Sequence, residues 1–139
     1  MEIPNLFPRE LDSHKNDYGR VFVLAGSSGM VGAAFLCSLA ALRSGCGYVK
    51  LGLPWRLAAL AGSNSSMMCV LTVALPETED GSLSLLGKAR VLDACKDFDV
   101  VAAGPGLSMN AQTQQLLAQM LPELSQALVL DADALNALS

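Results

Sequence analysis

Residues 21–34 read VFVLAGSSGMVGAA, and this stretch decides the fold class. Its first five residues are a continuous apolar run, which is typical of a strand buried on both faces of a parallel sheet. A glycine–serine cluster at 26–29 then breaks the run. The segment 32–44 that follows is apolar nearly all round and ends at Gly45, which predicts a buried helix with glycine at its C-terminal end.

The same alternation of strand and helix continues along the chain. Further strands are predicted at 48–53, 67–74, 99–103 and 127–130, and further helices at 55–61, 83–95, 111–121 and 134–139. Alternation of this kind predicts an α/β fold with a mainly parallel sheet and helices on both faces. We divide the chain into an N-terminal arm, 1–17, and an α/β unit, 18–139.

Composition and charge exclude several classes of protein. Hydrophobic residues make up 52% of the 139 and charged residues 16%, which excludes intrinsic disorder. The net charge of −4 argues against a nucleic-acid partner. The uncharged stretch between Arg20 and Arg43 is long enough to span a bilayer, but the glycine–serine cluster interrupts it, so we expect no membrane partner.

The four cysteines form no Cys-x-x-Cys pair, and the chain has one histidine, so we expect no zinc site. We expect the thiols to be reduced and the protein to be cytoplasmic.

Three of the predicted strand ends carry residues suited to a ligand. In open parallel sheets, ligands bind at the carboxyl ends of the strands. These ends hold Gly26 and Ser27, with Gly32 and Ala33 opening the next helix; Gly104, Pro105 and Gly106; and Asp131 and Asp133. Glycine lets a ligand approach the backbone, and a helix N-terminus offers N–H groups to an anion. Each glycine loop equally fits an ordinary turn, and Asp133 equally fits a helix cap before Ala134.

The charges around the first loop favour an anionic ligand. No Asp or Glu occurs from Tyr18 to Pro76, while the same stretch holds Arg20, Arg43, Lys50 and Arg56. A basic segment suits a phosphate-bearing ligand, although these four are equally compatible with ordinary surface charges. The glycine spacing at 26–32 also resembles that of NADP oxidoreductases, but the acidic residue expected about 20 residues further on is absent.

Taken together, the loops resemble those of the ADP- or ATP-dependent NAD(P)H-hydrate dehydratases, members of the ribokinase-like superfamily often labelled carbohydrate kinases. The matching segments are His14-Lys15 with Gly19-Arg20-Val21 and Ala25-Gly26-Ser27; Gly32-Ala33-Ala34 with Ala41-Leu42-Arg43-Ser44-Gly45; Leu75-Pro76-Glu77; Gly104-Pro105-Gly106-Leu107; and Asp131-Ala132-Asp133-Ala134-Leu135-Asn136. Their order and approximate spacing match from about residue 14 to the end.

The resemblance implies a carbon–oxygen lyase of nicotinamide nucleotide repair. Such an enzyme dehydrates (6S)-NADH hydrate or (6S)-NADPH hydrate back to the reduced dinucleotide, with ADP or ATP and Mg²⁺. It implies that the substrate contacts Gly26, Ser27, Gly32, Ala33, Gly104, Pro105, Gly106, Asp131 and Asp133. The two aspartates would lie near the reacting phosphates, where Mg²⁺ or water is positioned.

The sequence departs from the family pattern at two points. Ser108 stands where the family usually has the last glycine of Gly-Pro-Gly-Leu-Gly. The family's Gly-Thr-Gly-Asp motif, which carries the catalytic base, does not occur in these 139 residues. We therefore expect an N-terminal, substrate-side half, inactive alone and with its catalytic base beyond Ser139.

Such a half would leave a sheet edge uncovered, so we also expect a homo-oligomer.

Two other functions remain open at this point. One is a ribokinase-like kinase acting on a sugar or a vitamin-like alcohol, and the other is a non-catalytic nucleotide-binding module. The segments Leu75-Pro76-Glu77 and 131–136 favour the dehydratase, because sugar kinases usually lack that set.

Overall fold

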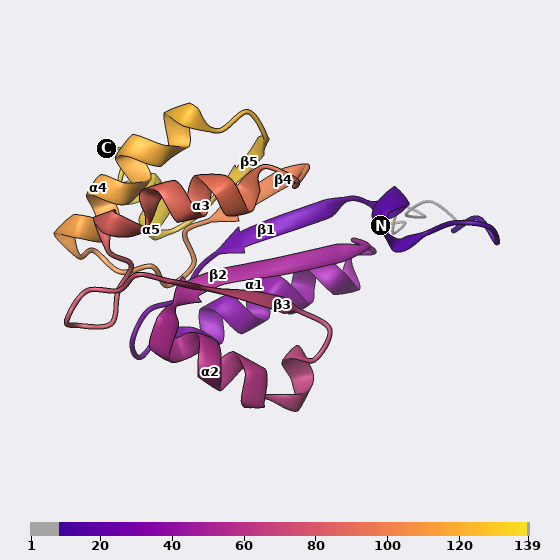
Figure 1. Cartoon of the computed structure of the whole chain (residues 1–139), viewed down its shortest axis with the longest axis horizontal. Coiled ribbons are helices and arrows are strands. Elements are labelled where there is room, and N and C mark those ends of the chain that lie inside the picture. The colour runs from indigo at the N-terminus through magenta and orange to yellow at the C-terminus, as the bar shows by residue number, and fades with distance from the viewer. Residues whose placement is uncertain (1–8, 139) are drawn as a thin grey trace, which may run out of the picture.

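Five parallel strands form one sheet in the computed structural model, which describes residues 9–138 (Figure 1). The strands are β1 (Arg20–Leu24), β2 (Tyr48–Pro54), β3 (Leu71–Leu75), β4 (Val100–Ala103) and β5 (Ala127–Leu130). Their order across the sheet is β3-β2-β1-β4-β5, with every neighbouring pair parallel. The order reverses between β1 and β4, and ligands of open α/β sheets bind at such a reversal.

Helices cover both faces of the sheet, as the alternation predicts. They are α1 (Val31–Arg43), α2 (Trp55–Ser63), α3 (Lys88–Cys95), α4 (Ala111–Met120) and α5 (Asp133–Asn136). Figure 1 shows α1 and α2 on one side of the sheet and α3, α4 and α5 on the other. The α/β fold class is therefore confirmed.

Two separate cores follow from the alternation of side chains along β1. Phe22 and Leu24 point into the core beneath α3 and α4, while Val23 and Ala25 point into the core beneath α1 and α2. All four side chains are fully buried. The first strand is thus buried on both faces, which explains why residues 21–25 are apolar without alternation.

The prediction that α1 is buried all round is wrong. Only Ala34 and Ser38 of this helix are buried, and Leu36 is 73% exposed. The helix packs one stripe against β1 and β2, and no described element covers its outer side. Helix α1 therefore presents apolar side chains on both its packed and its outer surfaces.

Several predicted boundaries also shift: the helix predicted at 55–61 runs to Ser63 and the one predicted at 134–139 ends at Asn136, and the starts of two elements shift for a clear reason. The strand predicted at 67–74 begins only at Leu71, because Asn64 accepts a hydrogen bond from the Ser66 N–H and starts a 3₁₀ turn at Ser65–Met67. The helix predicted at 83–95 begins as a 3₁₀ turn, Leu85–Gly87, and becomes α-helical at Lys88.

Strand β5 lies at the edge of the sheet and is largely uncovered. Its first three residues are exposed, and Val129 keeps 58% of its surface accessible. Of the predicted arm, residues 1–8 lie outside the described part, and Arg9 donates to the Gly45 carbonyl oxygen. Within residues 9–138, no helix combines the length and the hydropathy that a membrane span requires.

Candidate functional site

The first two predicted loops meet where the strand order reverses. The loop after β1 and the loop after β4 are joined by a hydrogen bond of 2.9 Å, from the Gly26 N–H to the Pro105 carbonyl oxygen. The Ser27 hydroxyl donates to the Gly106 carbonyl oxygen at 2.8 Å, and the Ser27 side chain is buried. The hydroxyl of Ser27 is thus committed to holding the two loops together.

Gly104 brings the loop after β4 against the loop after β5. Its φ of +132° lies in the region that favours glycine, and a Cβ built on it would lie 1.7 Å from the Asp131 carbonyl oxygen. Gly26 is constrained in the same way, with φ of +87° and the Cβ of Ala34 at 2.9 Å from its own Cβ position. The backbones approach here to distances that a side chain would prevent.

Helix α1 starts beside these loops. The Cβ of Ala33 would lie 3.1 Å from a Cβ on Gly106, so the first turn of α1 contacts the loop after β4. Gly32, in the same turn, is exposed, with open space where its Cβ would be. The first-turn N–H groups of α1 therefore face the same edge of the sheet as the glycine loops.

Asp133 links the loop after β5 to the loop after β4. Its Oδ2 accepts a hydrogen bond of 2.8 Å from the Ser108 N–H. Asp133 also opens α5, but it caps no N–H of that helix in the structure. Its carboxylate serves the neighbouring loop, and not the helix cap that the sequence left open as an alternative.

Ser108 is a conformational exception with compensating contacts. Its φ is +77°, which is uncommon for a residue with a side chain. The Ser108 hydroxyl lies 2.8 Å from the Ser82 hydroxyl and accepts from the Asn110 N–H at 3.2 Å. The left-handed backbone explains why glycine suits this position, and the hydroxyl contacts explain how serine is accommodated.

The loop after β5 combines an exposed carboxylate with a strained backbone. Asp131 is exposed, and the next residue, Ala132, has φ +45° and ψ −117°, a combination costly for a residue with a Cβ. Burial, and secondarily the charge of Asp131, raises the pKa of the Cys37 thiol on α1. The charge of Asp131 therefore acts on a residue of α1.

The polar loop after β3, residues 77–84, was not singled out from the sequence. The Gly81 carbonyl oxygen accepts from the Ser28 N–H at 2.9 Å, and Asp80 Oδ2 accepts from Asn110 Nδ2 at 2.9 Å. Hydrogen bonds from Thr78 and then Asn110 lower the pKa of Asp80. This loop ties the loops after β1 and β4 to each other from a third side. The Thr, Ser and Asp residues that follow the Leu-Pro-Glu segment are the signal that could have predicted a hydrogen-bonded turn here.

The basic segment surrounds the first glycine loop only in part: Arg56, in the first turn of α2, lies at the same end of the sheet, and two of the other basic residues do not. Arg20 begins β1 and Arg43 ends α1, so both lie at the end of the sheet opposite that loop. Arg20 binds Asp99 through Nη2–Oδ1 at 3.0 Å and Nε–Oδ2 at 3.3 Å, and this pairing lowers the pKa of Asp99. Arg20 and Arg43 therefore contribute no charge to the glycine loops.

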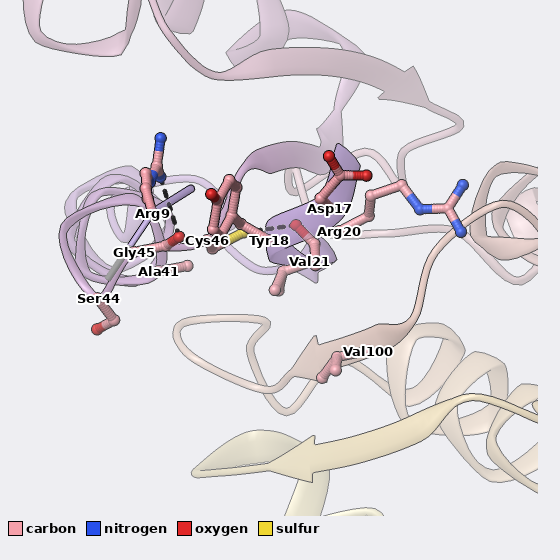
Figure 2. Close-up of a pocket in the computed structure, with 11 residues that line it drawn as sticks. Arg9, Asp17, Tyr18, Arg20, Val21, Ala41, Ser44, Gly45, Cys46 and Val100 are labelled. Atoms are coloured by element: carbon pink, nitrogen blue, oxygen red, sulfur yellow. Dashed lines mark hydrogen bonds between the residues drawn. The ribbon is translucent and has the colours of Figure 1, made fainter. Parts of the chain in front are cut away.

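A cavity of about 680 Å³ also lies at that opposite end. Figure 2 shows its walls, which include the apolar side chains of Val21, Ala41 and Val100 beside Tyr18 and Cys46. Val21 and Val100 belong to the starts of β1 and β4. This cavity contains none of the site residues predicted from the sequence.

Comparison with known proteins assigns the family. The sequence model of the Carb_kinase family, described as NAD(P)H-hydrate dehydratase, matches residues 21–139. The chain belongs to this family. The match begins at β1 and includes each of the loops described above.

Individual relatives agree with the family match. The chain is 39% identical over 131 residues to a bifunctional NAD(P)H-hydrate repair enzyme of Moorella thermoacetica, covering 94% of this chain and 24% of that protein. An ADP/ATP-dependent NAD(P)H-hydrate dehydratase of Bacillus subtilis, co-crystallized with ATP/Mg²⁺, superposes with a TM-score of 0.69 at 30% identity, covering 92% of this chain and 42% of that one. A ribokinase-like superfamily protein of Enterococcus faecalis shares the fold, with a TM-score of 0.77 at 23% identity, covering 94% of this chain and 42% of that one.

The chain thus spans about a quarter of the bifunctional relative and less than half of the dehydratase. Within the part that the structure describes, this NAD(P)H-hydrate dehydratase family member brings no three His, Cys, Asp or Glu side chains together as a metal site.

Proposed function

We propose that this chain forms the dinucleotide-binding part of an ADP- or ATP-dependent NAD(P)H-hydrate dehydratase. The observation that carries the proposal is the junction of the loops after β1 and β4 at the reversal of strand order, in a chain of this family. The substrate is the hydrate of NADH or NADPH, and the product is the reduced dinucleotide. The proposed role is repair of damaged nicotinamide nucleotides.

The residues of the junction divide into two groups. The backbone N–H groups of Gly32 and Gly106 would bind the substrate, because loops of this kind and helix N-termini bind anions. The N–H groups of Ala33 and Gly104 donate to the carbonyl oxygens of Met30 and Leu24, so these two residues would contribute by shape alone. The glycines, with Pro105, keep the backbones of the two loops close together. Ser27 would act indirectly, by holding Gly106 in place through its buried hydroxyl.

The proposed reaction needs a leaving group at the hydrated ring carbon. The bound nucleotide with Mg²⁺ would supply a phosphoryl group that turns the ring hydroxyl into a phosphate ester, which then leaves as the ring loses a proton and regains its double bond. The exposed carboxylate of Asp131 fits a magnesium–nucleotide complex, because Mg²⁺ on substrate phosphates needs only one or two protein carboxylates. Asp133 would hold the loop 104–108 close to Asp131 by accepting the hydrogen bond from the Ser108 N–H.

A segment exchange tests the proposal. The part of the B. subtilis dehydratase that this chain matches is replaced by the present sequence, and NADPH formation from its hydrate is followed by absorbance with ATP and Mg²⁺. We expect nucleotide-dependent dehydration. A matched Asp131→Asn exchange, at the exposed carboxylate proposed for the magnesium–nucleotide complex, should lower it strongly, while Leu60→Ala, on the exposed side of α2, should not. A folded chimera that forms no NADPH would contradict the proposal, and one that phosphorylates a sugar instead would favour a kinase.

We expect the 139-residue chain alone to bind dinucleotide without turnover, because the B. subtilis enzyme is more than twice its length. Turnover by the purified chain would contradict this expectation.

We further propose a cytoplasmic location, which the four unpaired thiols of Cys37, Cys46, Cys69 and Cys95 support.

A further inference from the structure

An exposed tryptophan lies at the same edge of the sheet as the glycine loops. Trp55 follows directly after β2, the strand that pairs with β1 on the side away from β4. Gly52 of β2 is level with Leu24, the last residue of β1, so Trp55 lies just beyond the point where the first glycine loop begins. Its side chain is 53% exposed, although tryptophan is usually one of the most buried residues.

Arg56 stacks against this ring and is held there. The guanidinium carbon lies 5.2 Å from the centre of the Trp55 ring, within the range of a cation–π contact. Glu77, from the loop after β3, holds Arg56 twice: its Oε1 is 2.8 Å from Nη1, and its Oε2 accepts from the Arg56 backbone N–H at 3.2 Å. The Glu77 side chain is only 4% exposed, so a buried carboxylate anchors an exposed cation.

We propose that Trp55 and Arg56 form a stacking platform for the adenine ring of a nucleotide bound at this edge. The proposal rests on the proposed function, because it places one end of the ligand that the glycine loops bind. A fixed aromatic ring with a guanidinium beside it offers two flat surfaces on which a nucleobase stacks.

The chemistry of the platform selects the base over the other parts of the ligand. Glu77 neutralises Arg56, so the platform attracts a phosphate weakly, and phosphates are left to the backbone N–H groups of the loops. The hydrated nicotinamide ring contains saturated carbons and is not flat, whereas adenine is a planar aromatic ring. Adenine occurs both in the dinucleotide substrate and in ADP or ATP, and the experiment below separates these two sources.

Trp55 reports on its own ligand, because it is the only tryptophan in the chain. The 139-residue protein is titrated with AMP and with ribose 5-phosphate, and tryptophan fluorescence is recorded with correction for absorbance. We expect saturable quenching by AMP alone. Equal quenching by ribose 5-phosphate, or none by AMP, would overturn the proposal.

Substitution measures the contribution of the platform to affinity. By calorimetry, Trp55→Leu should weaken AMP binding about ten-fold, in line with the loss of one base–aromatic stack, and Trp55→Phe should weaken it less. Leu60→Ala is the matched control, because Leu60 is an exposed apolar residue of the same helix, at 56% accessibility. Circular dichroism verifies folding of each variant. Unchanged affinity in a folded Trp55→Leu variant would overturn the proposal.

The active chimera separates this inference from the proposed function. There, Trp55→Leu should raise KM several-fold with little change in kcat. A raised KM for the hydrate assigns the platform to the dinucleotide, and a raised KM for ATP assigns it to the phosphoryl donor. An active chimera whose two KM values do not respond would refute the platform alone, and an inactive chimera that binds AMP through Trp55 would refute the dehydratase alone.

Discussion

Single residues at the loop junction have little freedom to vary, and Gly104 has the least. A Cβ at this position would overlap the Asp131 carbonyl oxygen, and its φ is positive as well. We expect Gly104→Ala to lower the free energy of unfolding by about 3 kcal/mol or more. Urea denaturation measures this change in the free energy of unfolding. Gly32→Ala is the control, because its Cβ points into open space on α1 and should raise stability by about 0.5 kcal/mol. Similar effects of the two substitutions would contradict this prediction, because they would show that the backbone around Gly104 moves to accept a Cβ at little cost in free energy.

Ser108 should reverse the usual ranking of alanine and glycine. Ser108→Ala keeps the strained φ of +77° and loses the contacts to Ser82 and Asn110, so we expect a loss of about 1–2 kcal/mol. Ser108→Gly loses the same contacts but relieves the backbone, and should stay within about 1 kcal/mol of the parent. Thermal unfolding of both variants measures the two changes in stability. Alanine as stable as glycine here would mean that the backbone strain is negligible.

Asp80 should make stability depend on pH in the acid range. Hydrogen bonds from Thr78 and Asn110 lower its folded pKa below the unfolded value of 3.8, so the carboxylate stabilises the fold above that value. This stabilisation is lost as the pH falls through the folded pKa. Asp80→Asn should therefore flatten the fall of Tm on acidification. Adding Asn110→Ala to that variant should flatten it little further, and a parallel pH profile for parent and Asp80→Asn would contradict the assignment.

The sequence predicted the glycines and aspartates of these loops but not their partners. Gly26, Gly104 and Asp133 stand out because of residue type and position after an apolar run. The contacts of Ser108 with Ser82 and Asp133 join residues 26 and 25 positions apart, respectively, and no local pattern encodes them. Arg20 and Arg43 were misplaced because charge was counted along the chain, whereas a strand or helix places its first and last residues at opposite ends of the sheet.

At the scale of elements, the order of strands and helices follows from the pattern, and their burial does not. The apolar run at 127–130 predicts β5 with its observed bounds, yet three of its four residues are exposed. Apolar residues indicate that a face is suited to burial, and the presence of a covering element depends on the rest of the fold. The same reasoning explains why α1 is less buried than its composition predicts.

The edge strand β5 gives a prediction about self-association. Unpaired N–H and C=O groups beside apolar side chains promote pairing with another chain. We expect the isolated 139-residue protein to self-associate, and Val129→Lys, which adds a charge to the exposed side of the strand, to reduce the association. Light scattering at several concentrations measures both. A matched Leu86→Lys variant, at an exposed position away from the edge, should associate as the parent does. A monomeric parent would contradict the expected homo-oligomer.

For the whole molecule, strand–helix alternation predicts a parallel sheet but not the sequence in which strands lie across it. Each right-handed crossover can add the next strand on either side, and the chain changes direction only once, after β3. That single change places β1 beside β4 and creates the junction of Gly26 with Pro105. The alternation of strands and helices left this order open.

The separation of the two cores has a consequence for how the protein is made. The core beneath α1 and α2 uses mainly residues 21–70, whereas the other core needs residues up to Ala134. During synthesis the first core can collapse on the ribosome while the partners of β1's opposite face are still untranslated. The glycine loop after β1 lacks its hydrogen-bond partners until Pro105 and Gly106 have been synthesised. The end of the sheet that carries the glycine loops is thus the last part to become ordered, and pulse-labelled hydrogen exchange should find its amides protected after those of β2 and β3.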